Sequence, residues 1–165
     1  MCLRMINIRL ATDADHAGIW AMLEPVFRAG ETHALPRDIG ESEAISYWCG
    51  TTHKTFVAVQ DEAFLGTYRL CAYQGGGAMD VADCGYVTAS AAQGRGITRL
   101  MLEHSLIRAK EMGFRAMQFN FVVSTNMRAI RTWEASGFEV VGRLPLAFKH
   151  PQRGFVDALV MYRPL

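Results

Sequence analysis

Residues 87–102, VTASAAQGRGITRLML, are the most informative stretch of this chain. A strand-like segment ends near Thr88, a short loop follows, and residues 93–98 (QGRGIT) open a helix-forming stretch. Glycines in such a loop let backbone N–H groups approach a bulky anion, and the first turn of the following helix stabilises negative charge. Arg95 and Arg99 add positive charge at the same end. The segment therefore predicts a binding site for a phosphate group.

Two common phosphate-binding motifs are absent from this stretch. The P-loop pattern GxxxxGK[ST] does not occur, and the dinucleotide pattern GxGxxG fails because Arg99 stands where it needs a third glycine after Gly94 and Gly96. A lone GxG is also typical of an ordinary strand-to-helix turn. The surrounding sequence must decide between the two interpretations.

The flanking sequence predicts a mixed α/β fold around one sheet. Thr12 and Asp15 are spaced as a capping box before a helix, and Gly30, Gly113 and Gly137 follow helical stretches as terminators. A nearly continuous apolar run, RAMQFNFVV, is typical of a central strand. The expected helices cover residues 13–28, 43–49, 97–112 and 125–136, and the expected strands cover residues 5–10, 55–59, 63–73, 80–88, 115–123, 138–141 and 156–163.

Composition narrows the class of protein. The length of 165 residues and mass of 18.4 kDa predict a single domain over residues 1–165, which buries about 70% of its unfolded surface. Seventeen basic and sixteen acidic residues give a net charge of +1, which argues against a general nucleic-acid coat. We find neither a membrane-length apolar run nor a signal-peptide core near the start. Four scattered cysteines without ligand spacing predict a cytoplasmic protein with reduced thiols and no metal.

Two motifs together resemble the GNAT superfamily of acyl-CoA-dependent N-acetyltransferases. Gln93-x-x-Gly96-x-Thr98 is similar to the family pattern Q/R-x-x-G-x-G/A, with Thr98 as a departure. Downstream, the stretch NMRAIRTWEASGF, from Asn126, is similar to N-x-x-A-x-x-x-Y-x-x-x-G-F, with Trp133 in place of the tyrosine. The resemblance extends over roughly residues 6–162, and it implies a mixed, mostly antiparallel central sheet with helices on both faces.

The resemblance implies acetyl-CoA as the co-substrate. The strand before the phosphate loop splays from its neighbour in this family, so the amides of Val87 and Thr88 are expected to hold the pantetheine arm together with Asn126. The hydroxyl of Thr98 offers a further donor to a phosphate oxygen. The diphosphate is expected on Gln93, Gly94, Arg95, Gly96, Ile97, Thr98 and Arg99.

The expected catalytic groups are Asp83, Asn120 and Trp133. An indole cannot give up its proton, so Trp133 is expected to wall the thioester channel and to be at most a weak donor to sulfur. The thiol of coenzyme A has an ordinary pKa of about 8–9, so its thiolate can leave without a strong acid. Asp83 is a candidate to accept the ammonium proton or to bind the ammonium, although a surface turn acid is the alternative. Glu31 and His33, in the loop that covers the acceptor site in this family, are rivals for acceptor binding.

The central strand also carries two amides. Gln118 and Asn120 alternate with apolar residues, so both are expected to face one way and, if buried, to need partners. They either satisfy the splayed backbone or bind a polar substrate, and we favour substrate binding for Asn120. Cys84 is expected to be inert packing, because direct transfer is the family pattern.

The predicted function is acetyl transfer to the amine of a small molecule by direct attack in a ternary complex. Short segments, including those around His150 and Asp157, are similar to a subgroup that acts on amino acids and proline analogues. Both residues are expected to be structural or to shape the acceptor site. The alternatives are a protein N-terminal or lysine acetyltransferase and a non-catalytic sensor of coenzyme A. No nucleic-acid or membrane partner is expected, and the family allows a homodimer.

Overall fold

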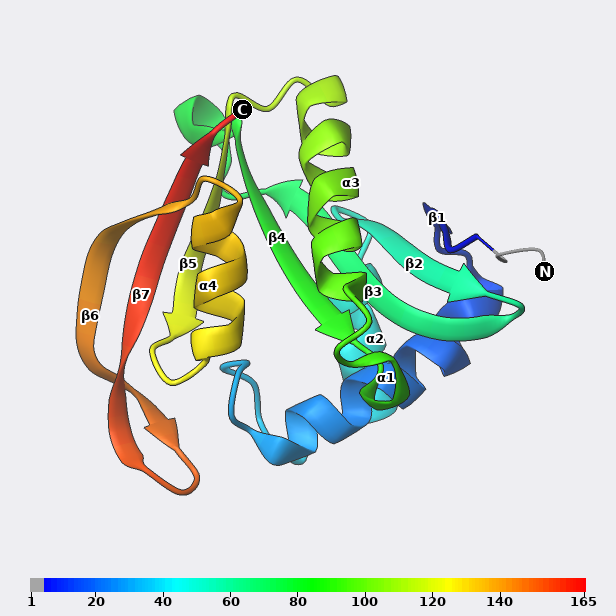
Figure 1. Cartoon of the computed structure of the whole chain (residues 1–165), viewed down its shortest axis with the longest axis horizontal. Coiled ribbons are helices and arrows are strands. Elements are labelled where there is room, and N and C mark those ends of the chain that lie inside the picture. Colours follow the sequence, from blue (N-terminus) through cyan, green and yellow to red (C-terminus); the bar gives the residue numbers. More distant parts are fainter. Residues whose placement is uncertain (1–4) are drawn as a thin grey trace.

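A seven-stranded mixed sheet organises the chain (Figure 1). The computed structural model describes residues 5–165. The strands lie in the order β1-β2-β3-β4-β5-β7-β6, and every neighbouring pair is antiparallel except β4 and β5, which are parallel. The strands are β1 (Asn7–Leu10), β2 (Lys54–Gln60), β3 (Ala63–Ala72), β4 (Val81–Thr88), β5 (Ala116–Val123), β6 (Glu139–His150) and β7 (Gly154–Pro164). This arrangement confirms the mixed, mostly antiparallel sheet.

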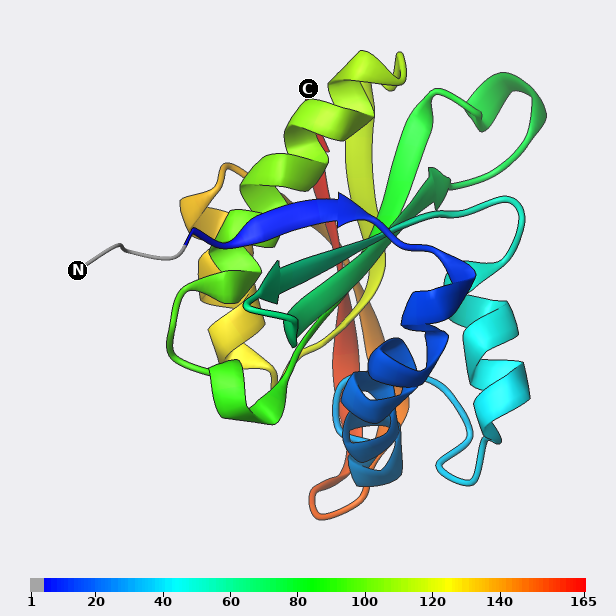
Figure 2. The same cartoon turned by 90° about the vertical axis from the view of Figure 1, so that its right-hand side faces the viewer.

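Helices cover both faces of this sheet (Figure 2). The four α-helices are α1 (His16–Ala29), α2 (Glu41–Cys49), α3 (Ile97–Glu111) and α4 (Met127–Ala135), and short 3-10 turns are η1 (Asp13–Asp15), η2 (Gly76–Ala78) and η3 (Ser90–Ala92). Side chains of α3 and α4, such as Met101 and Trp133, join one buried core with the sheet, and side chains of α1 and α2, such as Leu23 and Trp48, form the other. Two hydrophobic layers therefore fix the sheet between the helix pairs.

The turn η1, which leads into α1, shows the expected capping box. Asp15 accepts a hydrogen bond from the backbone N–H of Thr12 at 2.7 Å, and its carboxylate also binds both terminal nitrogens of Arg9 at 2.8 Å. The predicted first strand is shorter than expected and begins at Asn7. The arginine thus ties β1 to the helix that follows it.

The prediction for the last hairpin was too short. A strand was expected only over residues 138–141, whereas β6 continues to His150. Most of β6 is exposed because it is the edge strand, and its register shifts twice, so apolar residues do not alternate along it. Pro145 lies in this strand, where an edge position tolerates the missing N–H.

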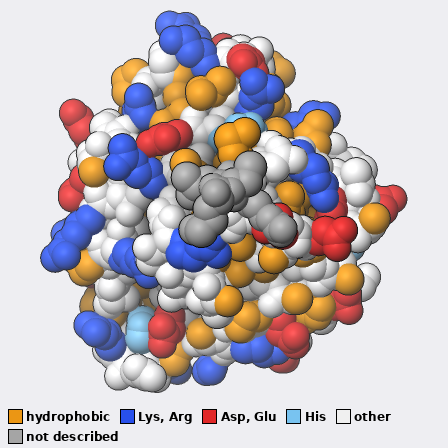
Figure 3. Space-filling view, turned by 45° about the vertical axis from the view of Figure 1, so that its right-hand side comes forward, with side chains coloured by type: hydrophobic (Ala, Val, Ile, Leu, Met, Phe, Trp, Pro, Cys, Tyr) orange, Lys and Arg blue, Asp and Glu red, His pale blue; other side chains and the backbone are white. Residues whose placement is uncertain are grey.

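The surface carries charges of both signs. On the face in Figure 3, basic and acidic side chains are interspersed among apolar ones rather than gathered by sign. No helix within residues 5–165 is long and apolar enough to cross a membrane.

Candidate active site

A cavity of about 740 Å³ opens between β4 and β5. The two strands pair only at Val81–Asp83 with Ala116–Gln118, although both run on for several residues beyond. Figure 1 shows them close at one end and apart at the other. The cavity is lined by β4 from Asp83 onward, β5, the start of α3, α4, and the end of α1 with the loop after it.

The register of β4 against β3 decides which backbone groups face this cavity. Tyr73 donates to the carbonyl of Val81 at 2.7 Å, and Ala89 donates to the carbonyl of Leu65 at 2.9 Å. In an antiparallel ladder the backbone groups of alternate residues point to the same neighbour. The odd-numbered residues of β4 therefore bond to β3, and the even-numbered ones face β5.

This alternation corrects one expectation for the pantetheine arm. Thr88 and Tyr86 present their N–H and C=O groups to the gap where β5 has separated. Val87 lies opposite Thr67 in the bonded set, so its amide belongs to the β3–β4 ladder and is not available to a ligand. Its side chain still lines the cavity. We therefore expect the backbone groups of Tyr86, rather than those of Val87, to bind the pantetheine arm together with Thr88.

The phosphate loop has the backbone that an anion cradle needs. Gly94 and Gly96 have φ values of 78° and 77°, in the left-handed region that favours glycine, and an added Cβ at either would meet nothing within 4 Å. The first intrahelical bond of α3 runs from Leu100 to Gly96 at 3.1 Å. The N–H groups of residues 97–99 therefore lack helical acceptors and point out of the helix start. The N-terminal end of α3, which carries the positive end of the helix dipole, lies at the cavity.

Other groups of the loop are already engaged. The backbone N–H groups of Gln93 and Arg95 donate to Ser90 and Ala92 at 3.4 and 3.3 Å. The Arg95 side chain donates to Gln60 at 2.7 Å and is not part of the cavity lining, which corrects its assignment to the diphosphate. The Gln93 side chain remains exposed at the cavity.

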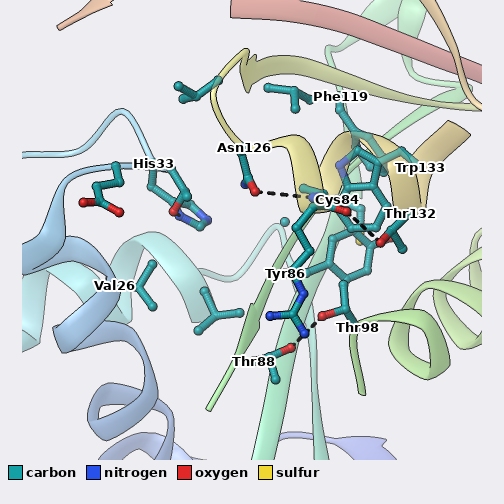
Figure 4. Close-up of a pocket in the computed structure, with 18 of the residues that line it drawn as sticks. Val26, His33, Cys84, Tyr86, Thr88, Thr98, Phe119, Asn126, Thr132 and Trp133 are labelled. Carbon is teal, nitrogen blue, oxygen red and sulfur yellow. Dashed lines mark hydrogen bonds between the residues drawn. The ribbon is translucent and has the colours of Figure 1, made fainter. Parts of the chain in front are cut away.

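Two side chains at the start of α3, Thr98 and Arg99, have defined partners in the structure. The hydroxyl of Thr98 lies 2.8 Å from that of Thr88 and so ties the start of α3 to the end of β4 (Figure 4). Arg99 lines the cavity and pairs with Glu103 at 2.9 Å, one turn along the helix. The positive charge of Arg99 near the cradle is therefore exposed and shared with Glu103.

Trp133 forms a wall of the cavity with two other aromatic residues. It is 7% exposed, and its ring centroid lies 5.1 Å from Tyr86 and 5.0 Å from Phe119. The Tyr86 hydroxyl is hydrogen-bonded to Ser105 at 2.7 Å, and burial raises the pKa of Tyr86 well above its usual 10. This tyrosine is thus a packing residue rather than an acid.

Asn126 combines a structural role with a free amide. Its side-chain oxygen caps α4 by accepting from the N–H of Ala129 at 3.3 Å, a role that the sequence analysis missed. The residue lines the large cavity and also a second, polar cavity of about 190 Å³ beside it. Its NH₂ group is left to donate to a ligand.

The expected acceptor residues Asp83, Asn120, Glu31 and His33 all line the large cavity, and Figure 4 shows His33 facing Tyr86 across it. Asn120 is exposed and Gln118 is half-buried outside the lining, so the need of a buried amide for a partner does not apply to Asn120. Asn120 has no hydrogen-bond partner in the described part of the chain, which leaves its amide available.

His33 is held neutral by its surroundings. Its ring lies 5.5 Å from Phe27 and 6.1 Å from Trp48, and its Nδ1 is 3.1 Å from the Thr32 hydroxyl. Burial and the charge of Arg69 lower the pKa of His33 to about 4. A group with this pKa is a poor proton acceptor at neutral pH. His33 can shape the cavity but is a weak candidate for a base.

Cys84, His150 and Asp157 are in structural positions. Cys84 is buried and burial raises its pKa, so its thiol stays protonated. His150 is buried beside the small cavity, and its Nδ1 accepts from the backbone of Gln152 at 3.2 Å. Asp157 binds Arg143 at 2.6 Å and the N–H of Leu146 at 2.9 Å, so it stabilises the irregular part of β6.

Some cavity residues were missed by sequence reasoning. The clearest is Arg69, whose charged side chain interrupts the otherwise uncharged strand AFLGTYRLCA, a signal that could have been noticed. Tyr47, Arg128 and Thr132 also line the cavity but lie on helical surfaces where their residue types are ordinary. Among residues 5–165 no group of three or more potential metal ligands was found.

Comparison with known proteins agrees with this geometry. The model of the acetyltransferase (GNAT) family matches residues 17–138. A GCN5-related N-acetyltransferase from Kribbella flavida is 38% identical, with a TM-score of 0.92 over 97% of this chain and 98% of that one. A phosphinothricin acetyltransferase from Sinorhizobium meliloti, solved in complex with AcCoA, shares the fold at 23% identity, with a TM-score of 0.85 over 97% of this chain and 88% of that one.

A curated relative gives a more distant match. N-acetyltransferase aca1 of Schizosaccharomyces pombe is 27% identical over 99 residues, which are 59% of this chain and 47% of that protein. This match spans only about half the length of that relative. The family model, in contrast, covers most of the chain and both motif regions. The chain therefore belongs to the GNAT family of acetyltransferases.

Proposed function

We propose that this protein transfers the acetyl group of acetyl-CoA to the amine of a small molecule such as an amino acid or an antimetabolite. The observation that carries this proposal is the position of the free N–H groups at the start of α3. They lie beside the gap in which Tyr86 and Thr88 present unpaired backbone groups. An anion cradle and a strand-like binding edge in one cavity suit a long ligand with a phosphate end.

The residues present fit acetyl-CoA along the whole cavity. Gly94, Gly96 and the amides of residues 97–99 would hold the diphosphate, with Arg99 beside them. Tyr86 and Thr88 would pair with the pantetheine arm, and the NH₂ group of Asn126 would donate to it. The open space at both glycines is what a bulky diphosphate requires. Bound acetyl-CoA supplies an activated acyl group and a thiolate leaving group.

The chain would assist transfer mainly by placing the amine. The aromatic wall around Trp133 excludes water from the thioester region, and the Tyr86 N–H can polarise the acyl oxygen. Asn120 and Asp83 lie on the acceptor side, where they can bind the amine and guide its proton to water. Since a thiol with an ordinary pKa of about 8–9 leaves readily, no tyrosine-type acid is needed.

A small acceptor is favoured by the shape and size of the cavity. The cavity of about 740 Å³ includes the cradle and the gap that we assign to acetyl-CoA, so only part of it is left for the acceptor. The loop after α1 places Glu31 and His33 in the lining of this cavity. The phosphinothricin acetyltransferase that shares this fold acts, by its name, on a small amine-bearing molecule. We carry that substrate class to this chain as part of the proposal.

Two measurements test this function. Acetyl-CoA at about 100 times its Kd should raise the melting temperature by roughly 5–10 °C through mass action. Thiol release from acetyl-CoA should then be followed across a panel of small amines, amino acids and peptides. Release with small amines supports the proposal. Release with peptides alone would indicate a protein acetyltransferase, and a thermal shift without any release would indicate a sensor.

A further inference from the structure

The acceptor end of the cavity holds an unusual arginine. Arg69 lies on β3 opposite Gly85 of β4, and its side chain lines the cavity although it is only 11% exposed. Its guanidinium lies 4.8 Å from the ring centroid of Tyr47 and 5.8 Å from that of Trp48. Aromatic faces favour a planar cation and leave its edges free for hydrogen bonds.

The donors of Arg69 are only partly used. One terminal nitrogen, Nη2, donates to the Tyr47 hydroxyl at 3.1 Å and to Asp83 at 3.2 Å. The other, Nη1, has only the sulfur of Cys71 at 3.6 Å, and Nε is buried with no partner in the described residues. A guanidinium has five N–H donors, and unmade buried hydrogen bonds are costly. Arg69 therefore keeps unused donor capacity beside the cavity, at Nη1 and at the buried Nε.

Asp83 complements this arginine. Its Oδ2 pairs with Arg69, while its Oδ1 has no hydrogen-bond partner in the described residues. The Asp83 side chain is 19% exposed and lines the cavity, and Oδ1 is the oxygen that the pair with Arg69 leaves unused. Neighbouring His33 is uncharged at neutral pH. One free cationic donor and one free anionic acceptor thus lie side by side on the floor of the cavity.

A glycine keeps this pair accessible. Gly85 lines the cavity next to Asp83, and a Cβ added there would lie 3.5 Å from Nε of Arg69 and 3.5 Å from the Trp48 ring. A side chain at this position would therefore pack directly against the guanidinium and the Trp48 ring. The backbone of Gly85 is also adjacent to Tyr86, whose N–H faces the expected thioester. An amine held at Asp83 would be close to the reacting group.

We propose that Arg69 and Asp83 form a dipolar clamp that selects acceptors with an oxyanion close to the amine, as in α-amino acids. The Arg69 guanidinium binds the carboxylate or another oxyanion, and Asp83 Oδ1 receives the ammonium. Arg69 is thus a specificity-determining residue. This inference rests on the proposed acetyl transfer and names its acceptor class.

The test compares an α-amino acid, its carboxamide, and the corresponding amine without a carboxylate. A fourth arm, a carboxamide with a side-chain phosphinate, separates the two sources of oxyanion. Because hydrogen bonds to charged groups contribute strongly, kcat/KM of the wild-type protein should favour the acid by about 10- to 100-fold over the amide and amine. In Arg69→Gln the ratio of kcat/KM for the acid to that for the amide or amine should fall to about threefold or less, mainly because KM for the acid rises.

Two further variants make the result specific. Arg69→Lys keeps the charge without the planar fork and should retain part of the preference. Arg108→Gln is the matched control, because Arg108 also has a buried, unpartnered Nε but lies outside the cavity lining. It should leave the preference for the acid intact. Melting temperature and acetyl-CoA binding of each variant show that it is folded.

The outcomes separate this inference from the proposed function. If acetyl-CoA binds and amines are acetylated, but the acid is no better than the amide, the clamp is refuted while the function stands. An equal loss for all acceptors in Arg69→Gln would also refute it. If acetyl-CoA gives neither a thermal shift nor thiol release with any amine, the proposed function itself fails. If Arg69→Gln does not fold, the wild-type ratios and Arg69→Lys decide.

Discussion

Gly96 shows how one residue can join backbone geometry to ligand binding. Its φ of 77° is costly for a residue with a Cβ, and it immediately precedes the free amides of α3. The glycine therefore allows the positive φ of the turn and leaves open space beside the free amides. Substitutions that differ in charge can separate these two roles.

Gly96→Asp should raise the apparent KM for acetyl-CoA by at least about tenfold over Gly96→Ala, because only the aspartate adds negative charge beside the diphosphate. Both variants share the strain of a positive φ, about 1–2 kcal/mol. Gly113→Asp is the control, since Gly113 also has a positive φ of 89° but lies at the other end of α3. Steady-state kinetics would contradict the cradle if all three had similar KM values.

At the scale of elements, the junction of β1 and α1 depends on a single carboxylate. The hydrogen bonds from Arg9 lower the pKa of Asp15 far below its ordinary 3.8, against the opposing effect of burial, and the N–H of Thr12 adds to the lowering. A carboxyl with a depressed folded-state pKa stabilises the fold above its unfolded pKa. This stabilisation is lost as the pH falls below 3.8 toward the folded-state pKa.

Asp15→Asn should lower the free energy of unfolding by about 2 kcal/mol at pH 7, since it removes charged hydrogen bonds and weakens the cap. The difference from wild type should shrink when urea unfolding is repeated near pH 2, where the carboxyl of the unfolded wild-type chain is protonated and part of the stabilisation is lost. Asp13→Asn, in the same turn, is the control because the Asp13 side chain is fully exposed. Its effect should be within about 0.5 kcal/mol. A pH-independent loss in Asp15→Asn would contradict this account.

For the molecule as a whole, the proposed function depends on a sheet in which two neighbouring strands, β4 and β5, are hydrogen-bonded over only part of their length. Antiparallel pairing on both sides holds β4 to β3 and β5 to β7, while the parallel pair β4–β5 ends at Asp83 and Gln118. A ligand in the gap would complete the ladder on the free edge of β4. Under the proposed function, these free backbone groups of β4 would pair with the pantetheine arm.

Amide hydrogen exchange can show which backbone N–H groups of β4 are free. In the free protein the amides of Gly85 and Val87 should exchange slowly, because they bond to β3, and those of Tyr86 and Thr88 should exchange faster. Coenzyme A should slow Tyr86 and Thr88 by at least about tenfold while changing Gly85 and Val87 little. Slowing of Val87 equal to that of Tyr86 would refute the alternation. Equal protection of all four without ligand would show that the gap is closed.

Most helices and strands could be predicted from the sequence. Helix caps, positive-φ glycines and buried strands depend on residues that are close in the chain, so their patterns can be read locally. The expected α3 and β5 agree with the structure to within one residue at each end. The edge strand β6 escaped detection, since an exposed and irregular strand has no alternating pattern.

The family, the predicted anion cradle at Gly94 and Gly96, and the place of Asp83 and Asn126 at the cavity could all be inferred from the amino-acid order. Strand pairing was needed to show that the backbone groups of Tyr86, and not those of Val87, face the gap, and that Arg69 meets Asp83. The physical reason is strand register. Which backbone groups are free, and which charges become neighbours, depends on pairing between β3, β4 and β5, and that pairing joins residues far apart in the chain.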